Sequence, residues 1–278
     1  MVAPYVAAVD VNMGCPVHFS TSGGMGSALL RKPETVERIL TALVAALPCP
    51  VTCKIRLLGA SRRLGPSLVG SPVCTAPHVT ESEEETAQLA QLIQRCGVAA
   101  LGVHGRFIPQ KPREPAHWSR IAAVVRAVPG LPVIANGDVF AFGDFERLCS
   151  ATGAVAAMCA RAAQWDASVF RAEGPAPGAE VRRRYVEACL AWDNPLSNSK
   201  YCLREMLAVT PGALQCAEAV ALNAAKTTAA LAALYGLDAG DAAAYRAAAA
   251  ARAGQAQQRD APRTSSDEQG RKRTRDEL

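Results

Sequence analysis

Five short apolar segments alternate with longer helical stretches along the first 165 residues, and this alternation leaves few folds open. Each segment ends in a polar or glycine-rich cluster, as a buried strand does at its carboxyl end. The segments are VAAVDVNMGCP, CPVTCKIR, VAALGVHGR, LPVIANGD and AVAAMCARAA. The stretches with helical spacing are residues 33–47, 81–97, 118–128 and 141–153. Because strand and helix alternate, the sequence predicts a parallel sheet.

Polar side chains cluster at the carboxyl ends of the five predicted strands. In a parallel α/β barrel, the chemistry lies at these ends. A doubly wound open sheet is the alternative fold, but it usually has a GxGxxG turn after an early strand, and this sequence has none. The clustered residues are Asn12 and Cys15, Lys54 and Arg56, His104 and Arg106, Asn136 and Asp138, and Arg161.

The chain divides into regions of different composition. Five strand–helix units occupy about 165 residues, whereas a closed eight-unit barrel needs about 250. We therefore expect a partial (β/α)8 TIM-type barrel, with about five of eight strands, over residues 1–177. A small all-helical domain is expected over 178–238. A low-complexity tail is expected over 239–278, with a frayed helix followed by disorder. Residues 59–80 are rich in Gly, Pro and Ser without periodicity, and we expect an insertion there.

The composition of the sequence bears on whether the protein is a membrane, secreted, metal-binding or RNA-binding protein. No apolar run reaches the roughly 20 residues of a membrane helix, and the N-terminus lacks a secretory signal. We therefore expect a cytoplasmic protein with no membrane partner. The ten cysteines form no CxxC pairs, which favours reduced thiols, and we expect no metal site. A net charge of +5 permits RNA as a partner without requiring it.

Five motifs in a fixed order point to one family. They are VDVNMGCP, PVTCKIR, VHGR, PVIANGD and ARAAQWDASVF, and together they resemble a tRNA-dihydrouridine synthase, with most similarity to the eukaryotic position-20 class. The resemblance covers about residues 9–237, and SNSKYCLREML resembles that family's helical domain. It implies a monomeric FMN-dependent barrel that reduces a D-loop uridine of tRNA to 5,6-dihydrouridine with NADPH or NADH. The family has three further strands ahead of VDVNMGCP, so we expect this chain to be a piece of such an enzyme.

The resemblance implies that Cys15 is the general acid. Hydride transfer to C6 of uracil leaves negative charge on the base, and a thiol with an ordinary pKa of about 8.5 can supply the proton. The alternative is that Cys15 is a small core residue, as most cysteines are.

A second group of residues is expected at the flavin. Lys54 lies in an apolar strand and needs an anionic partner, which is either the reduced flavin or an acidic side chain. His104 is either a flavin contact, as the resemblance implies, or a satisfied core histidine. The resemblance places the FMN phosphate near Asn136, Gly137 and Asp138, where a simple turn is the alternative. It also adds Asn12, Ala160 and Arg161 to the cofactor-binding set.

Basic side chains are the candidates for contacts with tRNA. Phosphate contacts by Lys and Arg are independent of sequence, and each such residue alone is more often a solvated charge. Two other functions remain open: an FMN barrel oxidoreductase that acts on a free pyrimidine, and an inactive or RNA-binding fragment that has lost its flavin. The candidates for the RNA contact are Arg106, Lys111, Arg113, Arg183 and Lys200.

Overall fold

The computed structural model describes residues 3–59 and 79–260. The chain forms two compact units. The first comprises Met1–Ala163 and Val169–Gly174, and the second comprises Gln164–Ser168 and Pro175–Leu278. Residues 60–78, within the expected insertion, and residues 261–278 of the expected tail lie outside the described residues.

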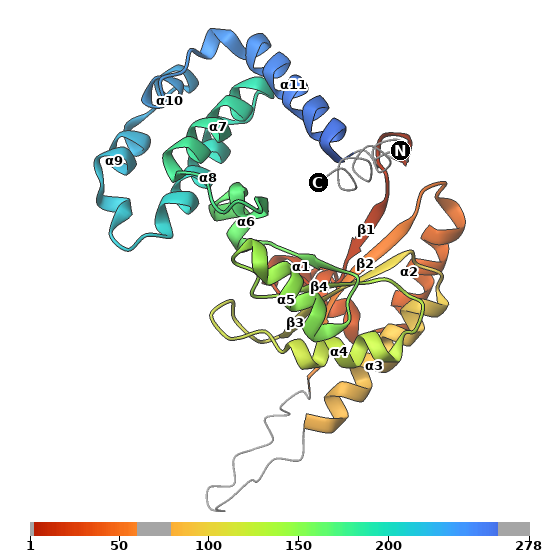
Figure 1. Ribbon diagram of the computed structural model, residues 1–278. Coiled ribbons are helices and arrows are strands. Elements are labelled where there is room, and N and C mark those ends of the chain that lie inside the picture. The colour runs from red at the N-terminus through yellow and green to blue at the C-terminus, as the bar shows by residue number, and fades with distance from the viewer. Residues whose placement is uncertain (1–2, 60–78, 261–278) are drawn as a thin grey trace, which may run out of the picture. The chain divides into compact units, whose positions relative to one another are not determined.

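A five-stranded parallel sheet forms the centre of the first unit (Figure 1). The strands follow one another in chain order, and each is hydrogen-bonded in parallel to the next. This order is that of consecutive units in a barrel wall, and it confirms the predicted partial barrel with five strands. The strands are β1 (Val9–Asn12), β2 (Val51–Leu57), β3 (Ala100–Phe107), β4 (Val133–Asn136) and β5 (Ala156–Met158).

Helices α2 to α5 connect consecutive strands and cover one face of the sheet (Figure 1). Their bounds agree with the predicted helical stretches to within two residues. Helix α2 begins with Pro33 in its first turn, where the missing N–H costs nothing. The helical segments of this unit are η1 (Ala3–Tyr5), α1 (His18–Ser22), η2 (Gly26–Arg31), α2 (Pro33–Ala46), α3 (Val79–Arg95), α4 (Trp118–Ala127), α5 (Phe142–Thr152), α6 (Arg161–Trp165), which continues into the second unit, and η3 (Ala167–Phe170).

Alternation along the strands separates a core face from a polar face. In β2, Cys53, Ile55 and Leu57 are buried in the hydrophobic core with the helices. The residues between them, Lys54 and Arg56, point to the other face, because successive side chains of a strand alternate. The same alternation in β3 and β4 brings polar residues of neighbouring strands together on the face opposite the helices.

The second unit is helical and has its own core. Its last helix, α11, lies in the region where a frayed helix followed by disorder was predicted. This helix is tied to its own unit: the Tyr245 hydroxyl accepts from the Asp238 N–H at 3.1 Å, and Arg246 donates to the Ala191 carbonyl at 2.9 Å. The helical segments are α7 (Gly178–Ala191), α8 (Leu196–Ala208), η4 (Ala213–Gln215), α9 (Ala217–Ala224), α10 (Thr228–Leu234), η5 (Ala239–Asp241) and α11 (Ala242–Asp260).

Among the helices in residues 3–59 and 79–260, none combines the length and the apolar character needed to cross a bilayer.

Candidate active site

Strand register places the predicted site residues side by side. Asn12 at the end of β1 pairs with Lys54 of β2. Further along, Arg56 of β2 pairs with His104 of β3, and His104 pairs with Asn136 of β4. Because the strands are parallel, these side chains share the carboxyl edge of the sheet. The predicted residues of four different strands therefore meet at one edge.

A cleft of about 140 Å³ opens at this edge. It brings together six of the eight residues predicted to bind the cofactor: His104, Asn136, Gly137, Asp138, Ala160 and Arg161. Asn12 and Lys54 lie on the adjoining strands and do not line it. Residues that were not predicted for the cofactor also line the cleft, namely Arg56, Arg106, Pro112, Val139, Phe140 and Met158.

Asp138 links the two sides of the cleft. Its Oδ1 accepts hydrogen bonds from Arg106 and, at 2.8 Å, from Arg161. Its Oδ2 accepts from the Ala116 N–H at 2.7 Å. Burial opposes ionisation of Asp138, but the hydrogen bonds from Arg106 and Ala116 outweigh it and hold the pKa of this carboxyl below its ordinary value. Asp138 therefore carries a negative charge and fixes both guanidinium groups.

The turn that carries Asp138 depends on Gly137. Gly137 has a φ of +133°, and a Cβ there would lie 2.7 Å from the Ala116 side chain. The Gly137 carbonyl accepts from the Trp118 indole N–H at 3.0 Å. A larger residue would therefore displace the turn from α4, so the sequence NGD forms more than a simple surface turn.

His104 is held in its neutral form. Burial and the charges of Lys54, Arg56 and Arg106 lower its pKa to about 3. A nitrogen of the Arg106 guanidinium lies 3.1 Å from His104 Nε2. Because guanidinium can only donate, Nε2 must accept, and the proton of the neutral ring lies on Nδ1. His104 thus offers one N–H donor without a charge.

Lys54 lies at the same edge, where the charge of Asp10 acts to keep it protonated. Burial is the largest cause that lowers its pKa, to about 8, and the charge of Arg56 adds to it. Within the part of the chain that the structure describes, Lys54 forms no ion pair, so the predicted alternative of a strand-end salt bridge is not seen. The ammonium is available to an anionic ligand.

The charges around the cleft are unbalanced. Three arginines and one aspartate are among its lining residues, which leaves a formal excess of two positive charges before Lys54 is counted. Arg56 is only 8% exposed and donates to the carbonyls of Phe107 and Gln110, both at 3.2 Å. Positive charges that are buried close together repel one another, and a bound anion would offset this repulsion. The donor set therefore fits a phosphate group.

Cys15 lies in the loop that follows β1. The Met13 N–H donates to the Lys54 carbonyl at 2.8 Å, which holds the start of this loop against β2. The Ser20 hydroxyl donates to Cys15 Sγ at 3.4 Å. This hydrogen bond is the largest cause that lowers the pKa of the Cys15 thiol, followed by one from the Val17 main chain, and the charge of Arg56 also lowers it. Cys15 is partly exposed, and it is not the core residue of the alternative interpretation.

Comparison with known proteins agrees with this arrangement. A sequence model described as dihydrouridine synthase (Dus) matches residues 1–63 and 69–230, which is most of the chain. The chain belongs to the dihydrouridine synthase family. The match is interrupted at residues 64–68, inside the segment predicted to be an insertion.

Several curated Dus proteins are similar to this chain. The tRNA-dihydrouridine(20) synthase (NAD(P)+) of Schizosaccharomyces pombe is 33% identical over 213 residues, which are 74% of this chain and 40% of that protein. The tRNA-dihydrouridine synthase B of Xanthomonas axonopodis pv. citri is 37% identical over 163 residues, 58% of this chain and 42% of that protein. A probable tRNA-dihydrouridine synthase 1 of Synechocystis is 37% identical over 160 residues, 58% of this chain and 39% of that protein. This Dus chain thus spans about 40% of the length of these relatives.

The residues predicted to contact RNA have different surroundings in this Dus chain. Lys111 and Arg113 are exposed in the loop after β3. Arg106, in contrast, is 2% exposed and donates to the carbonyls of Pro112 and Glu114, so it fixes that loop and does not reach the surface. Arg183 pairs with Glu187 at 2.6 Å, and Lys200 donates to the carbonyls of Asn223 and Ala225.

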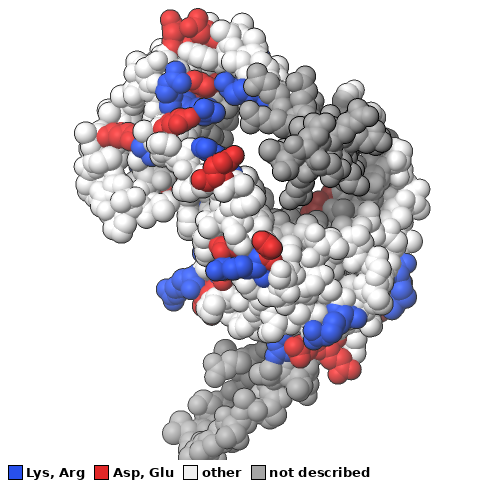
Figure 2. Space-filling model, viewed as in Figure 1, with Lys and Arg blue, Asp and Glu red and all other residues white. Residues whose placement is uncertain are grey.

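Charges of both signs are mixed over the visible face of the helical unit (Figure 2). Arg182 pairs with Glu218 at 2.7 Å, and Arg184 pairs with Glu180 at the same distance. Each arginine of the run that opens the helical unit therefore has an acidic partner.

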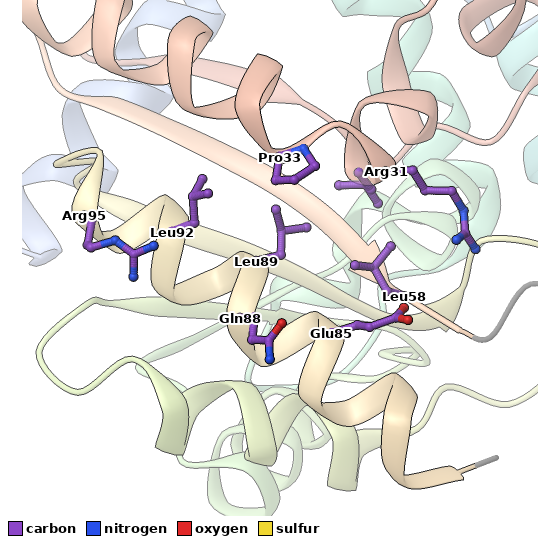
Figure 3. Close-up of a pocket in the computed structure, with 9 residues that line it drawn as sticks. Arg31, Pro33, Leu58, Glu85, Gln88, Leu89, Leu92 and Arg95 are labelled. Atoms are coloured by element: carbon purple, nitrogen blue, oxygen red, sulfur yellow. The ribbon is translucent and has the colours of Figure 1, made fainter.

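A second cavity, of about 430 Å³, lies between the η2–α2 segment and α3 (Figure 3). Its floor is formed by Leu30, Leu58, Leu89 and Leu92, and charged residues such as Arg95 lie at its rim. None of its lining residues is one of the predicted site residues. We therefore keep the candidate active site at the carboxyl edge of the sheet.

Sequence reasoning missed two contributors to the site. Arg56 was identified as a strand-end residue but given no role, and its alternation with Lys54 on β2 was the available signal. Ser20 was not singled out, because its contact with Cys15 depends on how the loop folds back. The hydroxyl-rich composition of that loop was the only signal in the sequence.

Proposed function

We propose that this chain reduces a D-loop uridine of tRNA to 5,6-dihydrouridine, with FMN as cofactor and NADPH or NADH as reductant. The observation that carries the proposal is the shared edge of the sheet: a partly exposed thiol follows β1, and a cleft lined by three arginines and one aspartate lies at the ends of β2 to β5. Family membership and the names of the similar relatives support the substrate class.

The cleft would hold the phosphate end of FMN. Its volume is well below the roughly 300 Å³ at which sites for whole organic ligands begin, so it suits one part of the cofactor. Arg161 and the main chain near Gly137 and Asp138 would bind the phosphate, with Asn136 and Ala160 beside them. Lys54, His104 and Asn12 would contact the ring system. Bound FMN supplies the hydride that goes to C6 of uracil.

Cys15 would supply the proton. Hydride addition at C6 places two electrons in the base, and the proton from Cys15 Sγ completes the reduction at C5. The resulting thiolate regains a proton from water. The hydrogen bond from Ser20 and the charge of Arg56 stabilise that thiolate while it exists.

We assign the enzyme to the position-20 class, supported by the name of the S. pombe relative. Exposed Lys111 and Arg113 would contact tRNA phosphates, whereas Arg183 and Lys200 would do so only by giving up their present partners. The described cysteines are all free thiols, which supports a reducing compartment such as the cytoplasm. We further propose a monomer.

The test is to purify the chain, add FMN, and measure dihydrouridine by mass spectrometry after incubation with NADPH and unmodified tRNA. Free uracil is the parallel substrate. We expect a yellow protein and product in tRNA alone. Turnover of free uracil alone would favour a free-pyrimidine oxidoreductase. A colourless protein that binds tRNA but no FMN would favour an RNA-binding fragment, and either result would contradict the proposal.

A further inference from the structure

We propose that Ser20 is a positioning residue for Cys15, because its hydroxyl donates to the Sγ atom at 3.4 Å and fixes it in place. The role of this contact in catalysis depends on the function proposed above. Its effect on the thiol does not, since it follows from the loop geometry and can be measured without tRNA, flavin or turnover.

The loop is closed on both sides of the contact. The Met25 N–H donates to the Ser20 carbonyl at 2.9 Å, and the Ser27 N–H donates to the Cys15 carbonyl at 2.9 Å. Gly26, between these donors, has a φ of +57°, and a Cβ there would lie 2.5 Å from the Cys15 carbonyl oxygen. The loop segment at Gly26 therefore approaches the Cys15 main chain as closely as a glycine permits. The main chains of Ser20 and Cys15 are thus both held within the loop that brings their side chains into contact.

Within the described residues, the groups that shift the pKa of Cys15 include one charged side chain, Arg56. The Cys15 pKa is lowered first by the Ser20 hydroxyl, then by the Val17 main chain, and finally by the charge of Arg56 on β2, while burial raises it. A hydroxyl that donates to sulfur stabilises the anion more than the neutral thiol. Ser20 is therefore the strongest single influence on the protonation of Cys15.

This contact has two opposite consequences for a proton donor. A more acidic thiol transfers its proton more readily, which speeds the step near neutral pH. The same thiol loses its proton at a lower pH, so the alkaline limit of activity also lies at a lower pH. Replacing Ser20 by alanine should therefore slow the reaction at neutral pH and extend its alkaline limit upward.

Thiol alkylation tests the contact directly. The full chain is treated with iodoacetamide over a series of pH values, and the Cys15 peptide is followed by mass spectrometry, with the Cys49 peptide as an internal reference. We expect Ser20→Ala to slow Cys15 alkylation several-fold at neutral pH and to move its midpoint to higher pH, because only the thiolate reacts. Ser20→Thr keeps the hydroxyl and should resemble the wild type.

Thr21→Ala is the matched control. Thr21 lies on the same short helix, but its hydroxyl contacts only the carbonyls of Val17 and His18. An unchanged alkylation profile in Ser20→Ala would overturn the inference, and so would an equal shift in Thr21→Ala, which would indicate a general loosening of α1. If the wild-type chain reduces no uridine but Ser20→Ala still shifts the alkylation profile, the proposed function fails and this inference stands.

Discussion

Lys54 keeps a charge where the surroundings oppose it. Its neighbours on β2 are core residues; burial is the largest cause that lowers its pKa, the charge of Arg56 adds to it, and the charge of Asp10 opposes both. Residues that cost stability and carry no internal partner are typical of functional sites. His104 is also perturbed, because burial and three nearby cations keep it neutral, and its Nε2 accepts from Arg106.

Lys54→Met should stabilise the first unit by on the order of 1 kcal/mol, because methionine keeps the packing and removes the desolvated charge. The folded-state pKa of Lys54 is about 8, below the ordinary 10.5, so the folded chain binds fewer protons than the unfolded chain between these values. The cost is therefore full below pH 8 and disappears as the pH rises towards 10.5. Thermal melts of the wild type and of Lys54→Met, from below pH 8 up to pH 10.5, measure this cost in stability.

The control for Lys54→Met is Lys111→Met, at an exposed position in the loop after β3. It should leave the melting temperature unchanged. A lower melting temperature for Lys54→Met at neutral pH would contradict the account, since it would mean that the ammonium has a stabilising partner.

His104 should remain neutral at every pH at which an ordinary imidazole, with its pKa near 6.5, titrates. Its pKa of about 3 and the contact of Nε2 with Arg106 predict a ring with the proton on Nδ1. Nitrogen NMR of the labelled chain distinguishes the two tautomers and the cation. A titration of the His104 signals close to pH 6.5, or a proton on Nε2, would refute this prediction.

At the scale of elements, hydrophobic patterning and strand-end motifs were sufficient to predict the sheet, its helices and the edge that carries the site. Lys54, His104 and Asn136 could be placed because each lies within a predicted strand. The cleft walls could not be predicted, because they depend on contacts between distant segments, such as that of Arg161 with the Pro112 carbonyl at 2.9 Å.

Arg56 should be required for the order of the loop after β3. It donates to the carbonyls of Phe107 and Gln110, and its removal would leave both buried acceptors with one donor fewer. We expect Arg56→Ala to destabilise the first unit by about 1–3 kcal/mol and to speed hydrogen exchange of the loop amides. Arg126→Ala, at an exposed position of α4, is the control. Unchanged exchange in residues 107–114 would show that the loop is held by other contacts.

At the scale of the whole molecule, the net charge of +5 says little about where RNA binds. Arg182, Arg183 and Arg184 of the helical unit are paired with acids, and the arginines around the cleft are bonded to carbonyls and to Asp138. Within the described residues of the first unit, Lys111 and Arg113 combine exposure with a position beside the candidate site. Binding of tRNA should therefore depend on this loop.

Replacing Lys111 and Arg113 by alanine should weaken tRNA binding most at low salt. Removing one cation that binds a phosphate should reduce the slope of log affinity against log salt by about 1. Fluorescence anisotropy with labelled tRNA at several salt concentrations measures this slope, and Arg184→Ala, on the helical unit, is the comparison. Equal slopes for the wild type and the double variant would show that this loop is not part of the RNA interface.

The central claim is that Cys15 protonates a uracil whose hydride comes from a flavin held at the neighbouring strand ends. Single-turnover reduction of unmodified tRNA by the prereduced, FMN-loaded chain tests it most directly, with Cys15→Ala compared against Cys49→Ala. Cys15→Ala should accept electrons from NADPH as fast as the wild type and form dihydrouridine at least about 100-fold more slowly, while Cys49→Ala should match the wild type in both steps. Equal rates of dihydrouridine formation in all three proteins would contradict the account.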